Sequence, residues 1–210
     1  MCQCVGIKDM DHQGFIIQPG LAEQHKEQAC ALFWEAFRQK LSKLMAPEDK
    51  ALAFVRRVIR SDHAICAIDS DGRLLGVAGF KTPQGAFVGG TLEDLCAIYG
   101  SWGGLWRGIL LQLLERALVD DVLLMDGIFV APEARGQGIG TALLDAVART
   151  ARDQGLGKVR LDVIDINPRA RALYERCGYR AIETSDIGPL RHLFGFEAST
   201  TMHLDLRALN

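Results

Sequence analysis

The feature of this sequence that most restricts its fold is a glycine-rich turn set between a strand pattern and a helix pattern. Residues 122–130 read VLLMDGIFV, an apolar run of strand length, and residues 135–141 read RGQGIGT. After the turn, apolar side chains recur with the period of a helix, at Ile139, Leu143, Val147 and Ala151. Residues 159–163 then alternate apolar and polar, as a half-buried strand does. The order strand, helix, strand over residues 122–165 predicts a mixed α/β fold.

Patterns elsewhere in the chain add elements on both sides of this unit. Residues 22–44 and 47–60 have the apolar spacing of helices, and the residues DSDG at 69–72 predict a hairpin of strands 63–68 and 74–80. We further expect strands at residues 15–18, 179–183 and 200–206, and helices at residues 105–117 and 168–176. Because no linker or repeat divides the chain, we expect residues 1–210 to form one domain, with a flexible end at residues 1–13.

The charge balance and the cysteine pattern limit the partners and the compartment. Lys and Arg total 24 against 26 Asp and Glu, and this net charge of −2 disfavours binding to nucleic acid or to a membrane surface. The longest run without a charged residue has 12 residues, whereas a spanning helix needs about 20. We therefore expect a cytoplasmic protein with reduced thiols. Cys2, Cys4 and His12 lack a fourth ligand, so we expect no metal.

The glycine-rich turn has the chemistry of a phosphate site. Glycine lets the backbone approach a ligand closely, and the free N–H groups of a helix start favour an anion. Arg135 adds a cationic side chain, so a diphosphate would fit, and the alternative is a connector that binds nothing. No Lys follows the glycines as a P-loop requires, and the third glycine comes one place too early for a dinucleotide fingerprint.

Two blocks of the sequence resemble the GNAT superfamily of N-acetyltransferases. Residues 135–140, RGQGIG, are similar to the (Arg/Gln)-x-x-Gly-x-(Gly/Ala) signature of that family, and residues 128–133, IFVAPE, look like the strand that leads into it. Further along, the family's second block is matched by Asn167, Ala170, Leu173, Tyr174, Gly178 and Tyr179. The likeness is close over residues 122–183, whereas residues 15–80 fit the family in outline only.

The resemblance implies an α/β fold with a mixed, mostly antiparallel central sheet, helices on both faces, and two splayed strands that hold acetyl-CoA as co-substrate. The acetyl and pantetheine groups would lie against the backbone of the first strand, at Ile128, Phe129 and Val130. The pyrophosphate would lie on the turn and helix start, at Arg135, Gly136, Gln137, Gly138, Ile139, Gly140 and Thr141. Asn167 would bond the pantetheine, and Tyr174 would protonate the departing thiolate.

The chemistry of acetyl transfer to a primary amine agrees with these roles. A strand N–H can stabilise charge on the thioester carbonyl, and a phenol can supply a proton to the sulfur. Asn167 and Tyr174 are seven residues apart, about two helical turns, so both project from one face. Asn167 also fits a helix N-cap, and the alternative for Tyr174 is a packing residue.

The motif does not fix the catalytic base, for which we favour Asp126. Asp126 shares strand parity with Ile128 and Val130 and would face the same cleft. Glu93 and Asp94 are alternatives, and a solvated or salt-bridged carboxylate is the bland interpretation. With Asp120 and Asp121, these acids would form a cleft mouth that attracts a cationic amine.

Residues 82–119 make the chain longer than a minimal member of the family. We expect this extra helical segment to cover the acceptor cleft, to form a homodimer face or to pack on the core. The leading function is an acetyl-CoA-dependent N-acetyltransferase in which the amine attacks directly within a ternary complex. The alternative is a non-catalytic acyl-CoA-binding sensor or interaction module. The acceptor stays open between a small molecule and a protein amine.

Overall fold

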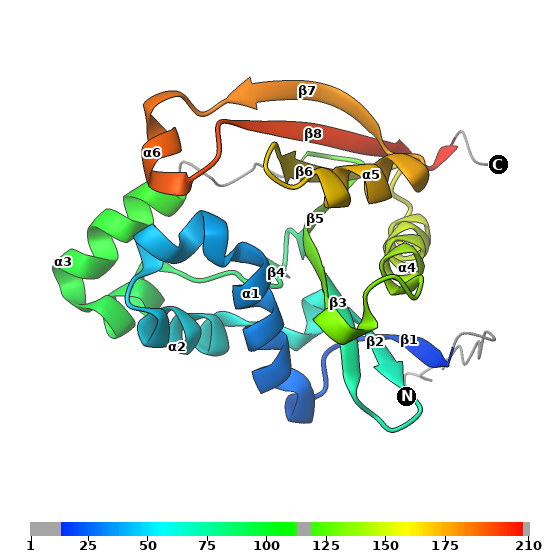
Figure 1. Ribbon diagram of the computed structural model, residues 1–210, viewed down its shortest axis with the longest axis horizontal. Helices are drawn as coiled ribbons and strands as arrows, with labels where there is room; N and C mark the ends of the chain where they lie inside the picture. The colour runs from blue at the N-terminus through cyan, green and yellow to red at the C-terminus, as the bar shows by residue number, and fades with distance from the viewer. Residues whose placement is uncertain (1–13, 113–118, 208–210) are drawn as a thin grey trace.

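The computed structural model describes residues 14–112 and 119–207, and its centre is a single eight-stranded sheet (Figure 1). The strands are β1 (Phe15–Pro19), β2 (Ala64–Asp69), β3 (Leu74–Thr82), β4 (Gly85–Ala86), β5 (Val122–Val130), β6 (Lys158–Ile164), β7 (Arg180–Asp186) and β8 (Ala198–Asp205). Their order is β1-β2-β3-β5-β6-β8-β7, with β4 beside β3. Every pair of neighbours is antiparallel except β5 and β6, which confirms the predicted mixed, mostly antiparallel sheet.

Helices cover both faces of the sheet. They are α1 (Lys26–Met45), α2 (Glu48–Val58), α3 (Leu92–Gln112), α4 (Ile139–Asp153), α5 (Pro168–Arg176) and α6 (Arg191–Phe194). Phe33 of α1 meets Phe129 of β5 with 6.0 Å between ring centroids, whereas Ile139 of α4 and Val130 of β5 both lie against Gly76 of β3. Because neighbouring side chains of a strand point to opposite faces, α1 and α4 lie on opposite sides of the sheet.

The predicted elements form, with shifts at their ends. The helix predicted from residue 22 begins as a 3-10 turn at Glu23–His25 and becomes α1 at Lys26, and the strand predicted at 179–183 runs from Arg180 to Asp186. The apolar face of α4 is confirmed, since Leu143, Val147 and Ala151 are fully buried. Residues 1–13 and the end of the helix predicted at 105–117 lie outside the described residues.

Residues 92–112 of the extra segment form α3, which bends at Gly100 (φ 76°) and docks on the turn between α1 and α2. Arg107 donates from Nε to Leu44 O at 2.9 Å and from Nη2 to Ala46 O at 2.8 Å, and the Tyr99 hydroxyl donates to Met45 O at 2.7 Å. These carbonyls end α1 and have no helical partner, so α3 satisfies them.

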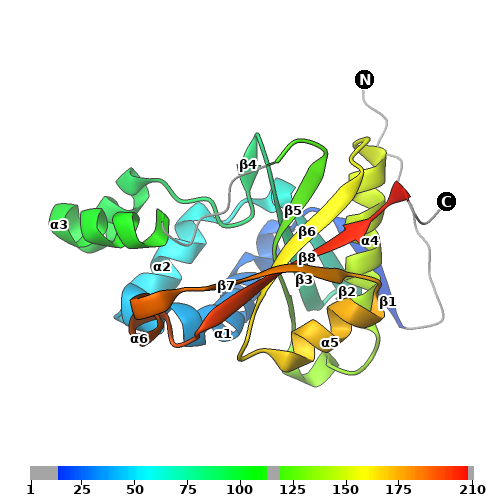
Figure 2. The ribbon, with the colours of Figure 1, turned by 90° about the horizontal axis from the view of Figure 1, so that it is seen from above.

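The outer side of α3 is open to solvent, at the end of the molecule away from α4 (Figures 1 and 2). Trp102 is 84% exposed and Ile109 is 57% exposed. A cover over the acceptor cleft and a homodimer face both stay predictions for this segment. Within the part of the chain that the structure describes, no helix is long and apolar enough to cross a membrane.

Candidate active site

Two neighbouring strands stop pairing where the candidate site begins. β5 and β6 pair over three residues, the last pair being Leu124 with Arg160. Beyond that pair, β5 runs on to Val130 and β6 to Ile164, and within the described residues neither bonds the other. The facing edges of the two strands therefore carry backbone groups without a ladder partner.

The backbone of β5 offers these groups at Ile128 and Val130. Ala131 N donates to Leu75 O on β3 at 2.8 Å. Hydrogen-bonded and non-bonded pairs alternate along an antiparallel ladder, so Phe129 also bonds β3, whereas the N–H and C=O groups of Ile128 and Val130 point away from it. The backbone groups of these two residues therefore point toward the β6 side of β5.

Phe129 does not join them. Its backbone belongs to the ladder with β3, and its side chain is 5% exposed. The ring lies between Phe33 and Phe87, at centroid distances of 6.0 and 5.8 Å. The structure therefore gives this predicted binding residue a place in the core.

The glycine-rich turn leads into an uncapped helix start. Gly136 and Gly138 have φ of 81° and 82°, the left-handed region that favours glycine, and Gly138 is the N-cap of α4 with no side-chain hydrogen bond. Ala142 N is the first to bond within the helix, to Gly138 O at 3.0 Å. The free N–H groups ahead of it belong to Ile139, Gly140 and Thr141. Such a start attracts an anion.

Side chains at the start of α4 pack in the core or against α5. Ile139 is 1% exposed, and a Cβ on Gly140 would lie 3.0 Å from Cδ2 of Leu173 on α5. Thr141 forms a hydrogen bond with the thiol of Cys177. Ile139 and Gly140 can therefore contact a ligand only through their backbone N–H groups. The contacts of Gly140 with Leu173 and of Thr141 with Cys177 hold α5 against α4.

Arg135 reaches across to α1. Its Nη2 lies 2.8 Å from Oε1 of Glu35, and its Nε donates to Val130 O at 3.1 Å. Both side chains of the ion pair are about half exposed, at 54% and 45%, so the pair is accessible to solvent. Sequence reasoning missed Glu35, because a surface glutamate 100 positions away carries no local signal.

The two site residues predicted around α5 lie in different environments, Asn167 exposed at the N-cap and Tyr174 buried within the helix. Asn167 caps the helix, its Oδ1 accepting from Ala170 N at 3.1 Å, which confirms the N-cap prediction. Tyr174 is 6% exposed, and its ring lies 6.0 Å from that of Tyr179. Burial raises the pKa of the Tyr174 phenol, and no described residue hydrogen-bonds to its hydroxyl.

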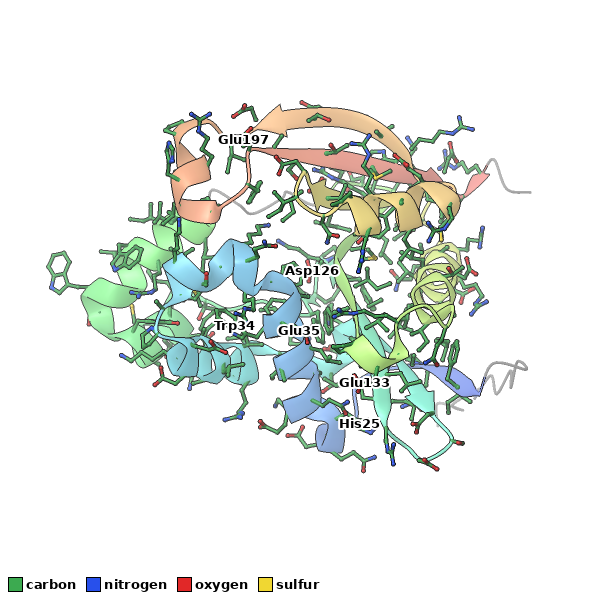
Figure 3. The ribbon with its side chains drawn as sticks, in the orientation of Figure 1. His25, Trp34, Glu35, Asp126, Glu133 and Glu197 are labelled. Atoms are coloured by element: carbon green, nitrogen blue, oxygen red, sulfur yellow. The ribbon has the colours of Figure 1, made fainter. Side chains whose placement is uncertain are left out.

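Asp126 occupies a β-bulge on β5. The register with β3 shifts between Gly79 and Phe80, so Asp126 is the extra residue without a partner. A bulge interrupts the strict alternation of side chains, so parity with Ile128 and Val130 no longer fixes the direction of the Asp126 side chain. The facing predicted for Asp126 stays a prediction, and the residue lies near the middle of the molecule (Figure 3).

The Asp126 side chain is half-buried and held by backbone donors. Phe87 N donates to its Oδ2 at 3.0 Å, and Val88 N bonds it as well. Burial raises the pKa of Asp126 to about 6, although these bonds and the charges of Lys81 and His63 act in the opposite direction. A carboxylate with this pKa is suited to exchange a proton near neutral pH.

Two of the other predicted acids are paired with arginines, and the acidic mouth stays a prediction. Asp94 accepts from Arg57 Nε at 2.7 Å, and hydrogen bonds from Thr91 and Arg57 lower its pKa. Asp121 pairs with Arg207 at 2.9 Å. The remaining two stay exposed: Glu93 and Asp120. Over residues 14–112 and 119–207, no three His, Cys, Asp or Glu side chains gather to hold a metal.

Comparisons with known proteins agree with this geometry. The acetyltransferase (GNAT) family profile matches residues 26–179. A GCN5-related N-acetyltransferase from Kribbella flavida superposes with a TM-score of 0.60 at 16% identity, covering 93% of this chain and 99% of that one. A GNAT-family acetyltransferase from Staphylococcus aureus Mu50 gives 0.54 at 18% identity, covering 91% and 99%.

The ribosomal-protein-S18-alanine N-acetyltransferase of Escherichia coli gives a TM-score of 0.53 at 17% identity, covering 91% of this chain and 94% of that one. At these identities the structures share the fold. No curated protein sequence matches the chain. Because the family profile spans most of the sequence, the protein belongs to the GNAT family of acetyltransferases.

Proposed function

We propose that this protein is an acetyl-CoA-dependent N-acetyltransferase in which a primary amine attacks the thioester directly, within a ternary complex. The observation that carries the proposal is a series of open backbone donors. Ile128 and Val130 turn their N–H groups away from β3, and the uncapped start of α4 follows after the turn. Strand donors suit amide and thioester carbonyls, and a helix start suits a diphosphate.

The residues around these donors fit an acyl-CoA. Acetyl-CoA would supply the thioester carbonyl and the thiolate leaving group. Gly136 leaves open space, since a Cβ there would meet no atom within 4 Å, and Arg135 can exchange Glu35 for a diphosphate oxygen. Asn167 uses its Oδ1 in the cap, which leaves its Nδ2 to donate to the pantetheine.

Asp126 is the proposed base. Its pKa of about 6 leaves it ionised at neutral pH, ready to take a proton from the amine directly or through water. Asp126→Asn should lower kcat/KM and remove the acidic limb of the pH profile. An unchanged limb in this variant would leave Asp126 without that role.

Tyr174 is the proposed acid. Burial raises its pKa, so the phenol keeps its proton throughout the neutral range, and its hydroxyl is not consumed by any described residue. It can therefore donate a hydrogen bond or a proton to the departing sulfur.

We propose the cytoplasm as the compartment of this protein. Four cysteines among the described residues are free thiols, as expected in a reducing compartment: Cys30, Cys66, Cys96 and Cys177.

A thiol-release assay with acetyl-CoA and a panel of amines tests the proposal. We expect release that depends on both the protein and one class of primary amine, with product mass raised by an acetyl group. Acetyl-CoA binding without release across small amines and peptide N-termini would favour the acyl-CoA sensor. Absence of acetyl-CoA binding by calorimetry would refute both.

A further inference from the structure

The hydrogen bonds that orient Asp126 come from a separate segment, residues 82–88. Phe87 N is shared between Asp126 Oδ2 at 3.0 Å and Phe80 O at 3.1 Å, and Val88 N supplies a second bond to the carboxylate. The side chain of Asp126 sits in a bulge without a ladder partner. Its orientation therefore depends on where residues 82–88 are held.

Arg60 holds this segment from outside the sheet. Its backbone N donates to Phe87 O at 2.9 Å, and its Nη1 donates to Gln84 O at 2.7 Å. The guanidinium lies directly on Gly85, where a Cβ would come within 2.3 Å of Nη1. A side chain at position 85 would displace the Arg60 guanidinium, so the glycine there allows Arg60 to reach Gln84 O.

Asp62 fixes Arg60 in turn. Its carboxylate accepts from Arg60 Nε at 3.1 Å and Nη2 at 2.7 Å, and it bonds Nδ1 of His63 at 2.9 Å. The other ring nitrogen of His63, which is 4% exposed, bonds Thr82 Oγ1 at 2.9 Å. We call Arg60, Asp62, His63 and Thr82 the Asp62 network. Its side chains reach Thr82 and Gln84, and the backbone of Arg60 adds the bond to Phe87 O.

We infer that the Asp62 network positions the base, holding residues 82–88 so that their N–H groups stay aimed at Asp126. The inference rests on the proposed function of Asp126. N–H donors stabilise a carboxylate, so a loosened segment should raise the pKa of Asp126. The charged or titratable side chains that act on Asp126 are His63 and Lys81, and both favour its ionised form.

The test is the pH profile of kcat/KM for Asp62→Asn, with Asp71→Asn as the matched control. Asp62 and Asp71 are both exposed carboxylates paired with an arginine, at 60% and 68%, but Asp71 lies in the β2–β3 turn. We expect Asp62→Asn to move the acidic limb upward by about half to one pH unit, a three- to tenfold loss at pH 5. The two enzymes should converge above pH 8, and Asp71→Asn should match wild type.

A merely structural role predicts a different result. An Asp62→Asn profile that keeps its midpoint, or that falls by one factor at every pH, overturns the inference. Thr82→Val, which keeps the shape of the side chain but removes the bond to His63, should shift the limb in the same direction. If Asp126→Asn retains the acidic limb of the pH profile, Asp126 is not the base. If Asp126→Asn removes the limb but Asp62→Asn and Thr82→Val do not shift its midpoint, the Asp62 network does not position Asp126.

Discussion

Asp126→Asn should stabilise the folded protein at alkaline pH while it removes activity. Burial raises the pKa of this carboxyl from 3.8 to about 6 in the folded state. The folded protein therefore holds the proton more tightly than the unfolded chain does. The associated stability is complete below pH 3.8 and is lost as pH rises through about 6.

The size of the effect follows from this shift. Two pKa units correspond to about 3 kcal/mol of cost for the ionised group above pH 6. Asparagine avoids that cost. It accepts fewer N–H bonds than the carboxylate, however, and this lowers the free energy of unfolding of the variant by about 1 kcal/mol. We expect Asp126→Asn to gain about 2 kcal/mol in free energy of unfolding at pH 8 and nothing near pH 4.

Urea unfolding at pH 4.5 and pH 8, followed by circular dichroism, measures this difference. Asp71→Asn again serves as control, because it removes an exposed carboxylate. The reasoning is refuted if the difference in unfolding free energy between wild type and Asp126→Asn is the same at both pH values. A variant less stable than wild type at pH 8 would show that Asp126 is stabilised, not strained, by its surroundings.

Three further predictions concern the cofactor site. Glu35→Gln should tighten CoA binding about twofold by calorimetry, because an exposed ion pair worth about 0.5 kcal/mol no longer competes for Arg135; Glu133→Gln, near the same turn, should change it less. Tyr174→Phe should lower kcat by about 10²–10⁴ with CoA affinity retained. Gly138→Val should cost about 1–2 kcal/mol in urea unfolding, because φ is 82° there, and should abolish CoA binding.

Local sequence signals predicted the elements that depend on local physics. Helix α4 was predicted from the period of Leu143, Val147 and Ala151, and its uncapped start from the glycines at 136 and 138. Both signals are local, because helical periodicity and left-handed φ are properties of a few adjacent residues. The ends of the elements were less certain: the first helix starts at Lys26 after a 3-10 turn, and β7 extends to Asp186.

Contacts between distant segments could not be predicted in this way. Strand alternation grouped Asp126 with the residues after it, but the bulge is set by the register with β3. Glu35 meets Arg135 only because α1 lies across the carboxyl end of β5. Asp62 is linked to Asp126 only indirectly, through Arg60, His63 and residues 82–88. In each case the information lies in the pairing of segments, which one sequence does not display.

Three locally unfavourable features lie along β5 and the turn that follows it. The strand edge at Ile128 and Val130 has no ladder partner, the start of α4 has no side-chain cap, and Asp126 is ionised at a cost. Two of them could be relieved by a conventional choice, namely continued pairing with β6 or an asparagine at position 126, whereas the left-handed φ of Gly138 keeps a capping side chain out of the helix start. A connector that binds nothing would have no reason to keep all three together. Unpaired donors, a positive helix end and a poised carboxylate are what an acyl-CoA and an amine would satisfy.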